Sequence, residues 1–213
     1  MSASAIHLVR HGEVYNPTGV LYGRIEGFGL SDLGAKMAAT AANSFEGRPV
    51  SRLVASPLQR TRESAAPWSE EFGLDIDIDE RLIEPWNRFE GTKVRFGPAM
   101  LSRPDVWKWV RNPFLPSWGE PYVDIAARML AAISEAYDSV DDGEVVLVSH
   151  QLPIWMVHRQ LAAERLYHDP RSRRCSLSSI TSLTRRDDGR FAETGYRDPA
   201  AALAVAATDT GAV

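Results

Sequence analysis

The sequence has only one cysteine, Cys175, among its 213 residues. A single cysteine cannot form a disulfide within the chain, so a disulfide-stabilised scaffold is excluded. The reducing cytoplasm is therefore the expected location. We expect Cys175 to be a structural thiol on a strand rather than a catalytic nucleophile.

Long hydrophobic runs are also missing. No apolar stretch approaches the ~20 residues that a membrane-spanning helix needs. The N-terminus lacks the basic-then-apolar pattern of a signal peptide, and no internal repeat has a solenoid period. We therefore expect a protein that has no membrane partner.

Basic residues are not in excess, with 24 Lys and Arg against 28 Asp and Glu and a formal net charge of −4. This balance gives no support to a nucleic-acid partner or an anionic membrane surface. A local basic pocket in such a protein would suit a small anionic substrate. The hydrophobic content of 44% and the charged content of 24% are those of a globular protein, and the length suits one domain.

The most informative stretch lies close to the N-terminus. Residues 6–9 are mostly apolar and predict a short buried strand, which stops at Arg10, His11 and Gly12. Ligands of α/β folds bind at the carboxyl ends of parallel strands. Arg10 offers a planar fork for phosphate or carboxylate, His11 is a candidate nucleophile or acid/base, and Gly12 permits close backbone approach. These residues alone fit a plain loop equally well.

A second strand end follows residues 53–55. Residues 56–59 have the form of a capping box with Ser56 as the N-cap, so a helix is expected to begin there and to continue to residue 72. Arg60 and Arg62 would then lie near the helix N-terminus. A cation is unfavourable there unless an anion is bound nearby. For Arg62, a solvated surface position is an equally open reading.

A third strand end follows residues 145–148, a fully apolar run typical of a strand buried on both faces of a parallel sheet. It stops at Ser149, His150 and Gln151. The remaining pattern predicts a helix between Ser31 and Gly47. Further elements are predicted as helices over 123–140 and 152–163, and β segments at 74–79, 176–184 and 191–196 with a hairpin turn at 187–189.

Two segments do not belong to this α/β pattern. Residues 85–121 are rich in Pro and Trp, with a short helix predicted at 106–110, and we interpret them as a lid insertion over the pocket. Structural packing of the tryptophans is the open alternative. Residues 199–213 form an Ala-rich tail without a chemical signal, which we expect to be frayed or disordered.

Four motifs in register resemble those of the histidine phosphatase superfamily, which includes the cofactor-dependent phosphoglycerate mutases. They are VRHGE at 9–13, SPLQRTR at 56–62, LIE with FEG over 82–91, and VSH at 148–150. Their order and spacing agree with the family to about residue 185. The resemblance implies a three-layer α/β/α sandwich with a mostly parallel central sheet and a lid insertion, formed by one domain over 1–198.

The resemblance also implies roles at the matching positions. His11 would be the residue that is phosphorylated during turnover. Arg10, Arg60 and His150 would surround the phosphoryl oxygens. Glu84 would protonate the leaving oxygen and then activate water. No metal or other cofactor is implied.

Four further residues are expected to contact the substrate. Asn16 falls where the family has a polar phosphate ligand. Gly23 belongs to a glycine-rich loop that we expect to wrap the ligand, with a plain connection as the open alternative. Gln151 replaces the glycine that usually follows the second histidine of the family. Arg88 stands where a small residue is common, so it is a candidate substrate contact.

Elementary chemistry adds two expectations. A neutral His11 can attack only if the proton on its far ring nitrogen is held, and a backbone carbonyl near Gly12 is the expected acceptor. An alkoxide leaves poorly, so a nearby acid is worth roughly 10²–10⁴-fold. Glu13 and Glu90 compete with Glu84 for that role, and Glu13 is expected to pair with a cation instead.

Three functions fit these observations. The first is a metal-independent phosphatase acting on a small phosphorylated metabolite, which we favour because the lid segment is poor in clustered basic residues. The second is a phosphoglycerate mutase that returns the phosphoryl group to its substrate. The third is a domain that only binds a phosphorylated ligand. The oligomeric state is open, with a homodimer as a weak expectation.

Overall fold

The structure is a computed structural model that describes residues 2–93 and 119–209. The predicted helix at 106–110 and most of the predicted lid insertion at 85–121 lie outside the described residues. Among the described helices, none has the length and apolar character needed to cross a membrane.

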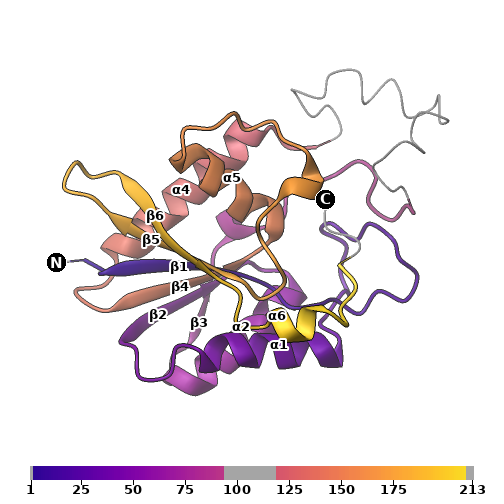
Figure 1. The fold of residues 1–213 in the computed structure, drawn as a ribbon, viewed down its shortest axis with the longest axis horizontal. Helices are drawn as coiled ribbons and strands as arrows, with labels where there is room; N and C mark the ends of the chain where they lie inside the picture. Colours follow the sequence, from indigo (N-terminus) through magenta and orange to yellow (C-terminus); the bar gives the residue numbers. More distant parts are fainter. Residues whose placement is uncertain (1, 94–118, 210–213) are drawn as a thin grey trace.

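A six-stranded sheet forms the centre of the described fold (Figure 1). Four neighbouring strands are parallel, and the last two continue the sheet in antiparallel fashion. The sheet order is β3-β2-β4-β1-β5-β6. The strands are β1 (Ala5–Arg10), β2 (Val50–Ala55), β3 (Ile76–Ile78), β4 (Glu144–Ser149), β5 (Ile180–Arg185) and β6 (Phe191–Arg197). The predicted mostly parallel sheet is confirmed.

Helices cover both faces of the sheet (Figure 1). On one face lie α1, α2 and the short α6, and on the other lie α4 and α5. The helices are α1 (Asp32–Asn43), α2 (Gln59–Phe72), α4 (Tyr122–Asp138), α5 (Gln151–Leu161) and α6 (Ala201–Ala204), with 3₁₀ turns η1 (Glu80–Leu82) and η3 (Pro170–Ser172). The predicted three-layer α/β/α arrangement is therefore confirmed.

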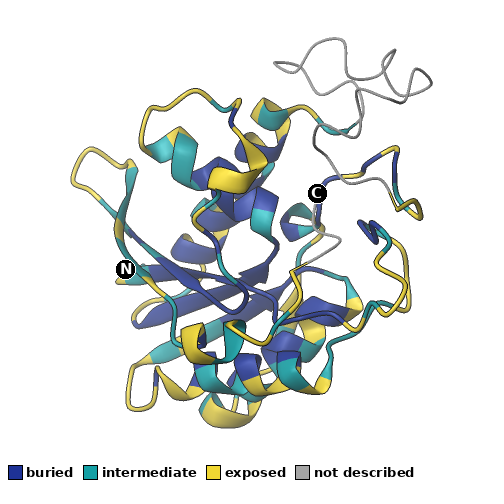
Figure 2. Ribbon diagram, turned by 45° about the vertical axis from the view of Figure 1, so that its right-hand side comes forward, coloured by how far each residue is buried: buried dark blue, intermediate teal, exposed yellow. Residues whose placement is uncertain are grey.

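The central strand β4 shows why its sequence is apolar throughout. Val145 and Leu147 belong to the core cluster that includes residues of α4. Val146 and Val148 point the other way, into the cluster that includes residues of α1 and α2. Successive side chains of a strand alternate between faces, so a strand with a helical layer on each side must be apolar at every position. In Figure 2 the central strands are accordingly buried.

The parallel register places the polar strand ends at one edge of the sheet. Arg10 at the end of β1 is aligned with Ser149 at the end of β4. Ala55 at the end of β2 is aligned with Val148, one residue earlier on β4. The residues that follow these three strands therefore meet at the carboxyl edge, where ligands of such sheets bind.

The start of α2 differs from the prediction. Helix α2 begins at Gln59, its N-cap is Leu58, and no side chain caps it. Ser56, predicted as the N-cap, instead places its hydroxyl 2.8 Å from Nε2 of His150. A hydroxyl held by a residue 94 positions away is not available to the helix, so the capping-box interpretation is wrong.

The other helix start agrees with its local sequence signal. Ser31 is the N-cap of α1, and its hydroxyl accepts a hydrogen bond from the Gly34 N–H. Cys175 is buried as expected, but it lies in the connection before β5 rather than on a strand.

The Ala-rich tail also differs from its expectation. Residues 201–204 form α6, and Ala200 packs with Met37 and Leu177 in a small core cluster. The chain then runs back to the carboxyl edge of the sheet, where Asp209 contacts the side chain of Arg10. The described part of the tail therefore has both a packing role and a contact with a predicted site residue.

Candidate active site

His11 directly follows β1 and is fully buried. Its Nδ1 lies 2.7 Å from the carbonyl oxygen of Gly12. Because a carbonyl can only accept, Nδ1 carries the proton and Nε2 carries a lone pair. Within the described residues, this buried Nε2 has no hydrogen-bond partner. The predicted backbone acceptor near Gly12 is thus confirmed, and the ring presents an unused nucleophilic nitrogen.

Gly12 is needed for a close approach between the loop after β1 and α1. A Cβ atom at this position would lie 2.3 Å from the carbonyl oxygen of Gly34. The Gly12 N–H also donates to the hydroxyl of Ser64 on α2, at 3.0 Å. The backbone that carries the His11 ring is therefore held between two helices.

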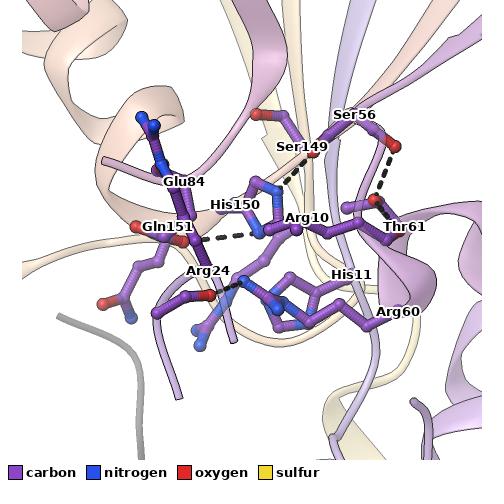
Figure 3. Close-up of polar contacts among 12 residues, drawn as sticks. Arg10, His11, Arg24, Ser56, Arg60, Thr61, Glu84, Ser149, His150 and Gln151 are labelled. Atoms are coloured by element: carbon purple, nitrogen blue, oxygen red, sulfur yellow. Dashed lines mark hydrogen bonds and ion pairs between the residues drawn. The ribbon is translucent and has the colours of Figure 1, made fainter. Parts of the chain in front are cut away.

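His150 occupies the N-cap position of α5, at the end of β4. The centres of the His150 and His11 rings are 5.2 Å apart, with the planes at 64°. On one side of the His150 ring, Nε2 lies 2.8 Å from the Ser56 hydroxyl. On the other side, Nδ1 lies 3.4 Å from Oε2 of Glu84. Figure 3 shows the two imidazoles and Glu84 in one cluster.

Glu84 lies shortly after η1 and is only 2% exposed. Its backbone carbonyl accepts a hydrogen bond from Nε of Arg24, at 2.5 Å. Burial raises the pKa of the Glu84 carboxyl, while the charge of Arg60 and other arginines opposes that rise. A raised pKa favours the protonated form, which is the form that a general acid needs.

Arg60 lies in the first turn of α2 and is only 1% exposed. Its Nη2 donates to the carbonyl oxygen of Gly23, at 2.8 Å, and its guanidinium lies 4.8 Å from the ring centre of Tyr22. Neither of these two partners is a carboxylate, so neither contact neutralises the buried positive charge of Arg60. A buried cation near a helix N-terminus is best stabilised by an anion.

Arg10 is fully buried and is the second guanidinium of the cluster. Its Nη1 donates to the carbonyl oxygen of Cys175, at 2.7 Å. Its two terminal nitrogens also donate to Asp209, with Nη1 2.8 Å from Oδ2 and Nη2 2.5 Å from Oδ1. No feature of the sequence around Arg10 or Asp209 predicts this two-pronged ion pair.

The electrostatics of the cluster keep both histidines neutral. Burial first, and then the charges of Arg60 and Arg10, lower the pKa of His11 well below its usual value. Burial and the charge of Arg60 likewise lower the pKa of His150. A neutral imidazole retains the lone pair that nucleophilic attack requires.

The same cluster offers ligand atoms for a metal. Atoms of His11, Glu84 and His150 lie within 4.8 Å of one another, and all three residues are buried. However, the charges of Arg10 and Arg60 act on both imidazoles. Two guanidiniums beside neutral imidazoles make the site attractive to an anion and repulsive to a dication. The arrangement therefore suits a tetrahedral oxyanion better than a metal ion.

The four residues predicted to contact the substrate have different environments in the structure. The Asn16 side chain bonds the backbone of Val20 through Nδ2 and Oδ1, which closes its own loop. The Gly23 carbonyl holds Arg60. Arg88 is exposed. Gln151 accepts a hydrogen bond from Arg173 at 3.2 Å, next to the cluster.

Two competing carboxylates have other contacts. Glu13, expected to pair with a cation, accepts hydrogen bonds from the Ser31 hydroxyl and from the Thr208 N–H, each at 2.5 Å. That expectation is wrong, because the N-cap serine of α1 and the tail occupy its oxygens. Oε1 of Glu90 accepts from the Asn87 N–H at 3.0 Å. Arg62, for which a solvated surface position was the open alternative, is exposed.

Sequence reasoning missed Ser56, Arg173 and Asp209. Ser56 was visible within its motif, but its local pattern indicated a helix cap. Arg173 donates to Gln151 and to Nε2 of His168, and burial lowers the pKa of its guanidinium to about 10. No periodicity or motif marks Arg173 or Asp209, because each reaches the site through the tertiary fold alone.

Comparisons with known proteins show the family and the fold of the chain. The model of the histidine phosphatase superfamily (branch 1) matches residues 6–197. A Mycobacterium tuberculosis protein called Rv0525 is 50% identical over 196 residues, which cover 92% of this chain and 96% of that protein. The glucosyl-3-phosphoglycerate phosphatase of M. tuberculosis is 30% identical, covering 70% and 71% of the two chains. The structure of a mycobacterial glucosyl-3-phosphoglycerate phosphatase with VO3 superimposes with a TM-score of 0.70 and 26% identity, covering 90% of this chain and 98% of the other.

Proposed function

The chain belongs to the histidine phosphatase superfamily (branch 1), whose relatives here are phosphate monoester hydrolases, and from this we propose that it is a metal-independent phosphatase working through a phosphohistidine. The substrate is a small phosphorylated metabolite. His11 receives the phosphoryl group, and Glu84 is the general acid and then the general base. Arg10, Arg60 and His150 bind the phosphoryl oxygens.

The observation that carries this proposal is the environment of His11 Nε2. This nitrogen is buried, has no hydrogen-bond partner in the described part of the chain, and is fixed as the unprotonated one by the Gly12 carbonyl. A buried lone pair without a partner is costly in a folded protein. Beside two guanidiniums and a buried carboxyl of raised pKa, it is explained by a role as nucleophile.

The first half of the reaction forms a bond from His11 Nε2 to phosphorus and breaks the bond to the leaving oxygen. The proton of Glu84 goes to that oxygen as it departs. In the second half, the Glu84 carboxylate takes a proton from water, whose oxygen attacks phosphorus and breaks the bond to Nε2. Phosphate leaves, and Glu84 is again protonated. The two guanidiniums stabilise charge on the equatorial oxygens throughout, which is the main requirement of phosphoryl transfer.

The relatives suggest which substrates to test first. Glucosyl-3-phosphoglycerate phosphatases and a phosphoserine phosphatase are among the matching proteins, the latter by fold alone at 19% identity. Their names indicate phosphate esters that also carry a carboxylate. We include glucosyl-3-phosphoglycerate, 3-phosphoglycerate and phosphoserine with sugar phosphates and nucleotides in the screen.

We further propose a cytoplasmic location, because the one cysteine of the chain is free and buried. A homodimer stays a prediction, which light scattering on the purified protein tests. Neither point affects the chemistry of the site.

Phosphate release from nitrophenyl phosphate, measured with and without EDTA, tests the proposed function. We expect release that EDTA does not change and that His11→Ala abolishes. Loss of activity in EDTA would contradict the metal-free mechanism. An inactive wild-type protein, on nitrophenyl phosphate and on the metabolite panel, would overturn the phosphatase assignment in favour of a mutase or a phospholigand-binding domain.

A further inference from the structure

The C-terminal tail reaches the phosphate-binding cluster. After α6, whose neighbour Ala200 is anchored in the core, the tail brings the Asp209 carboxylate onto the guanidinium of Arg10. Both terminal nitrogens of Arg10 donate to it, one to each carboxylate oxygen. This two-pronged geometry is the one that arginine also uses to bind phosphate.

A second contact holds the tail beside the site. The Thr208 N–H donates to Oε1 of Glu13 at 2.5 Å. The other oxygen of Glu13 accepts from the hydroxyl of Ser31, the N-cap of α1. Glu13, which lies two residues after the proposed nucleophile His11, therefore links the tail to the N-cap of α1. The position of Asp209 is set by a backbone contact as well as by its charge.

Asp209 takes N–H donors of Arg10 that a phosphoryl group could otherwise use. Arg10 has five such donors: Nη1 serves the Cys175 carbonyl, both Nη1 and Nη2 serve Asp209, and Nε has no partner within the described residues. His11, His150 and Arg10 have no exposed surface, and Glu84 is 2% exposed. A substrate can reach them only if some covering part of the chain moves away.

Asp209 itself is accessible enough to leave. Its side chain is 41% exposed, while that of Arg10 is fully buried. The carboxylate therefore neutralises a buried charge from the solvent side and is rehydrated when it leaves, and the cost of leaving Arg10 unpaired is avoided only if another anion takes its place. A phosphate ester carries more negative charge and can engage both guanidiniums, so it can replace Asp209 on Arg10.

We propose that Asp209 is a built-in competitor that occupies Arg10 in the resting enzyme and is displaced by the phosphoryl group of the substrate. The tail then acts as an autoinhibitory strap, lowering the affinity for phosphorylated ligands while keeping a buried arginine paired in their absence. This inference rests on the proposed function of the site. The alternative is that Asp209 orients Arg10 for the substrate, which predicts the opposite effect of removing it.

Binding of orthovanadate to the full-length protein, measured by calorimetry, tests the inference without turnover. We expect Asp209→Asn and Asp209→Ala to bind orthovanadate roughly 5- to 10-fold more tightly than the wild type. The KM for nitrophenyl phosphate should fall by a similar factor, with kcat changed less than twofold. Asp75→Asn, an exposed aspartate on the loop before β3, makes the same change in net charge and should leave both constants at wild-type values.

Hydrogen exchange provides the structural readout. Amides of residues 205–209 should exchange faster when orthovanadate is added to the wild type, because the tail is displaced. Unchanged or weaker vanadate binding by both Asp209 variants, or slower exchange of the tail, would overturn the competitor role. A wild-type protein that neither binds orthovanadate nor releases phosphate would instead contradict the proposed function itself.

Discussion

The hydroxyl of Ser56 lies 2.8 Å from Nε2 of His150, and both side chains are fully buried. This contact joins the end of β2 to the end of β4 and fixes one nitrogen of the ring, so that the other faces Glu84. Ser56 touches no reacting atom in this arrangement, so it is a positioning residue for His150.

Removing the Ser56 hydroxyl should therefore loosen the His150 ring. The loss of a buried hydrogen-bond partner costs about 1–3 kcal/mol, and we expect Ser56→Ala to reduce kcat/KM for nitrophenyl phosphate by roughly tenfold or more. Ser56→Thr, which keeps the hydroxyl, should recover most of that loss. Ser51→Ala makes the same change at the other end of β2 and should retain wild-type activity. Equal activity of the Ser56→Ala and Ser51→Ala proteins would contradict the positioning role.

Replacing the proposed acid should separate substrates by their leaving groups. Glu84→Gln cannot protonate a departing alkoxide, so kcat/KM for an alkyl phosphate should fall by about 10²–10⁴-fold. Nitrophenolate departs without help, so the same variant should lose far less on nitrophenyl phosphate. Glu90→Gln, which changes one of the two competing carboxylates, should show no such dependence. Equal losses on both substrates would remove Glu84 from the acid role.

The pH profile of kcat/KM provides an independent check of the same residue. The pKa of Glu84 is raised, and the proposed general acid acts in its protonated form, so the rate on alkyl phosphates should fall as pH rises through that raised pKa. The pKa of His11 is lowered, so the loss of nucleophile on the acid side should lie well below pH 6.5. Glu84→Gln should abolish the alkaline fall. An alkaline fall that persists in this variant would assign it to another group.

Gly12 should tolerate no side chain. A Cβ atom there meets the backbone carbonyl of Gly34 at 2.3 Å, and a backbone in α1 cannot shift without cost. We expect Gly12→Ala to lower the free energy of unfolding by about 2 kcal/mol or more, as measured by urea denaturation. Gly195→Ala on β6 meets no atom within 4 Å and should change it by less than about 0.5 kcal/mol. Similar stabilities for the two variants would contradict the close approach.

The far end of the sheet should carry an acid-sensitive contact. His7 is buried against Glu144 and Ser182, and burial lowers its pKa from 6.5 to about 4. The unfolded chain binds a proton on this side chain below pH 6.5, whereas the folded protein does so only near pH 4. The free energy of unfolding should therefore fall as pH decreases across this window, by about 1 kcal/mol per pH unit.

Urea denaturation at pH 7 and pH 5 measures this effect. His7 should account for roughly 2 kcal/mol of the stability that the wild-type protein loses between the two values, so His7→Asn, which does not titrate, should lose less than the wild type by about that amount. If both proteins lost the same amount of stability, the acid sensitivity would have to come from other groups.

The strand ends were predictable because abrupt changes in residue chemistry interrupt short apolar runs. Arg10, His11 and His150 each follow such a run, and the parallel register of β1 and β4 then brings them together. The tautomer of His11 was predictable for a similar reason, because the acceptor of its Nδ1 proton is the carbonyl of the adjacent residue, Gly12. Local sequence and the rule for parallel sheets were sufficient in these cases.

Other features depended on partners distant in the chain. Ser56 carries a valid local signal for a helix cap, but His150, 94 residues away, uses its hydroxyl instead. Asp209 lies in a tail of small apolar residues, and its partner Arg10 is 199 positions away. The residues next to Ser56 and Asp209 in the sequence do not determine these two contacts, because long-range hydrogen bonds compete with local ones in the folded chain.

Trapping the covalent intermediate tests the phosphohistidine mechanism most directly. Glu84→Gln should still release nitrophenolate but should not activate water, so the phosphoenzyme should accumulate. After an alkaline quench, which preserves phosphohistidine, peptide mass spectrometry should find one phosphoryl group on His11, in step with a burst of about one nitrophenolate per enzyme. No burst and no adduct, or an adduct on another residue such as His150, would contradict the account.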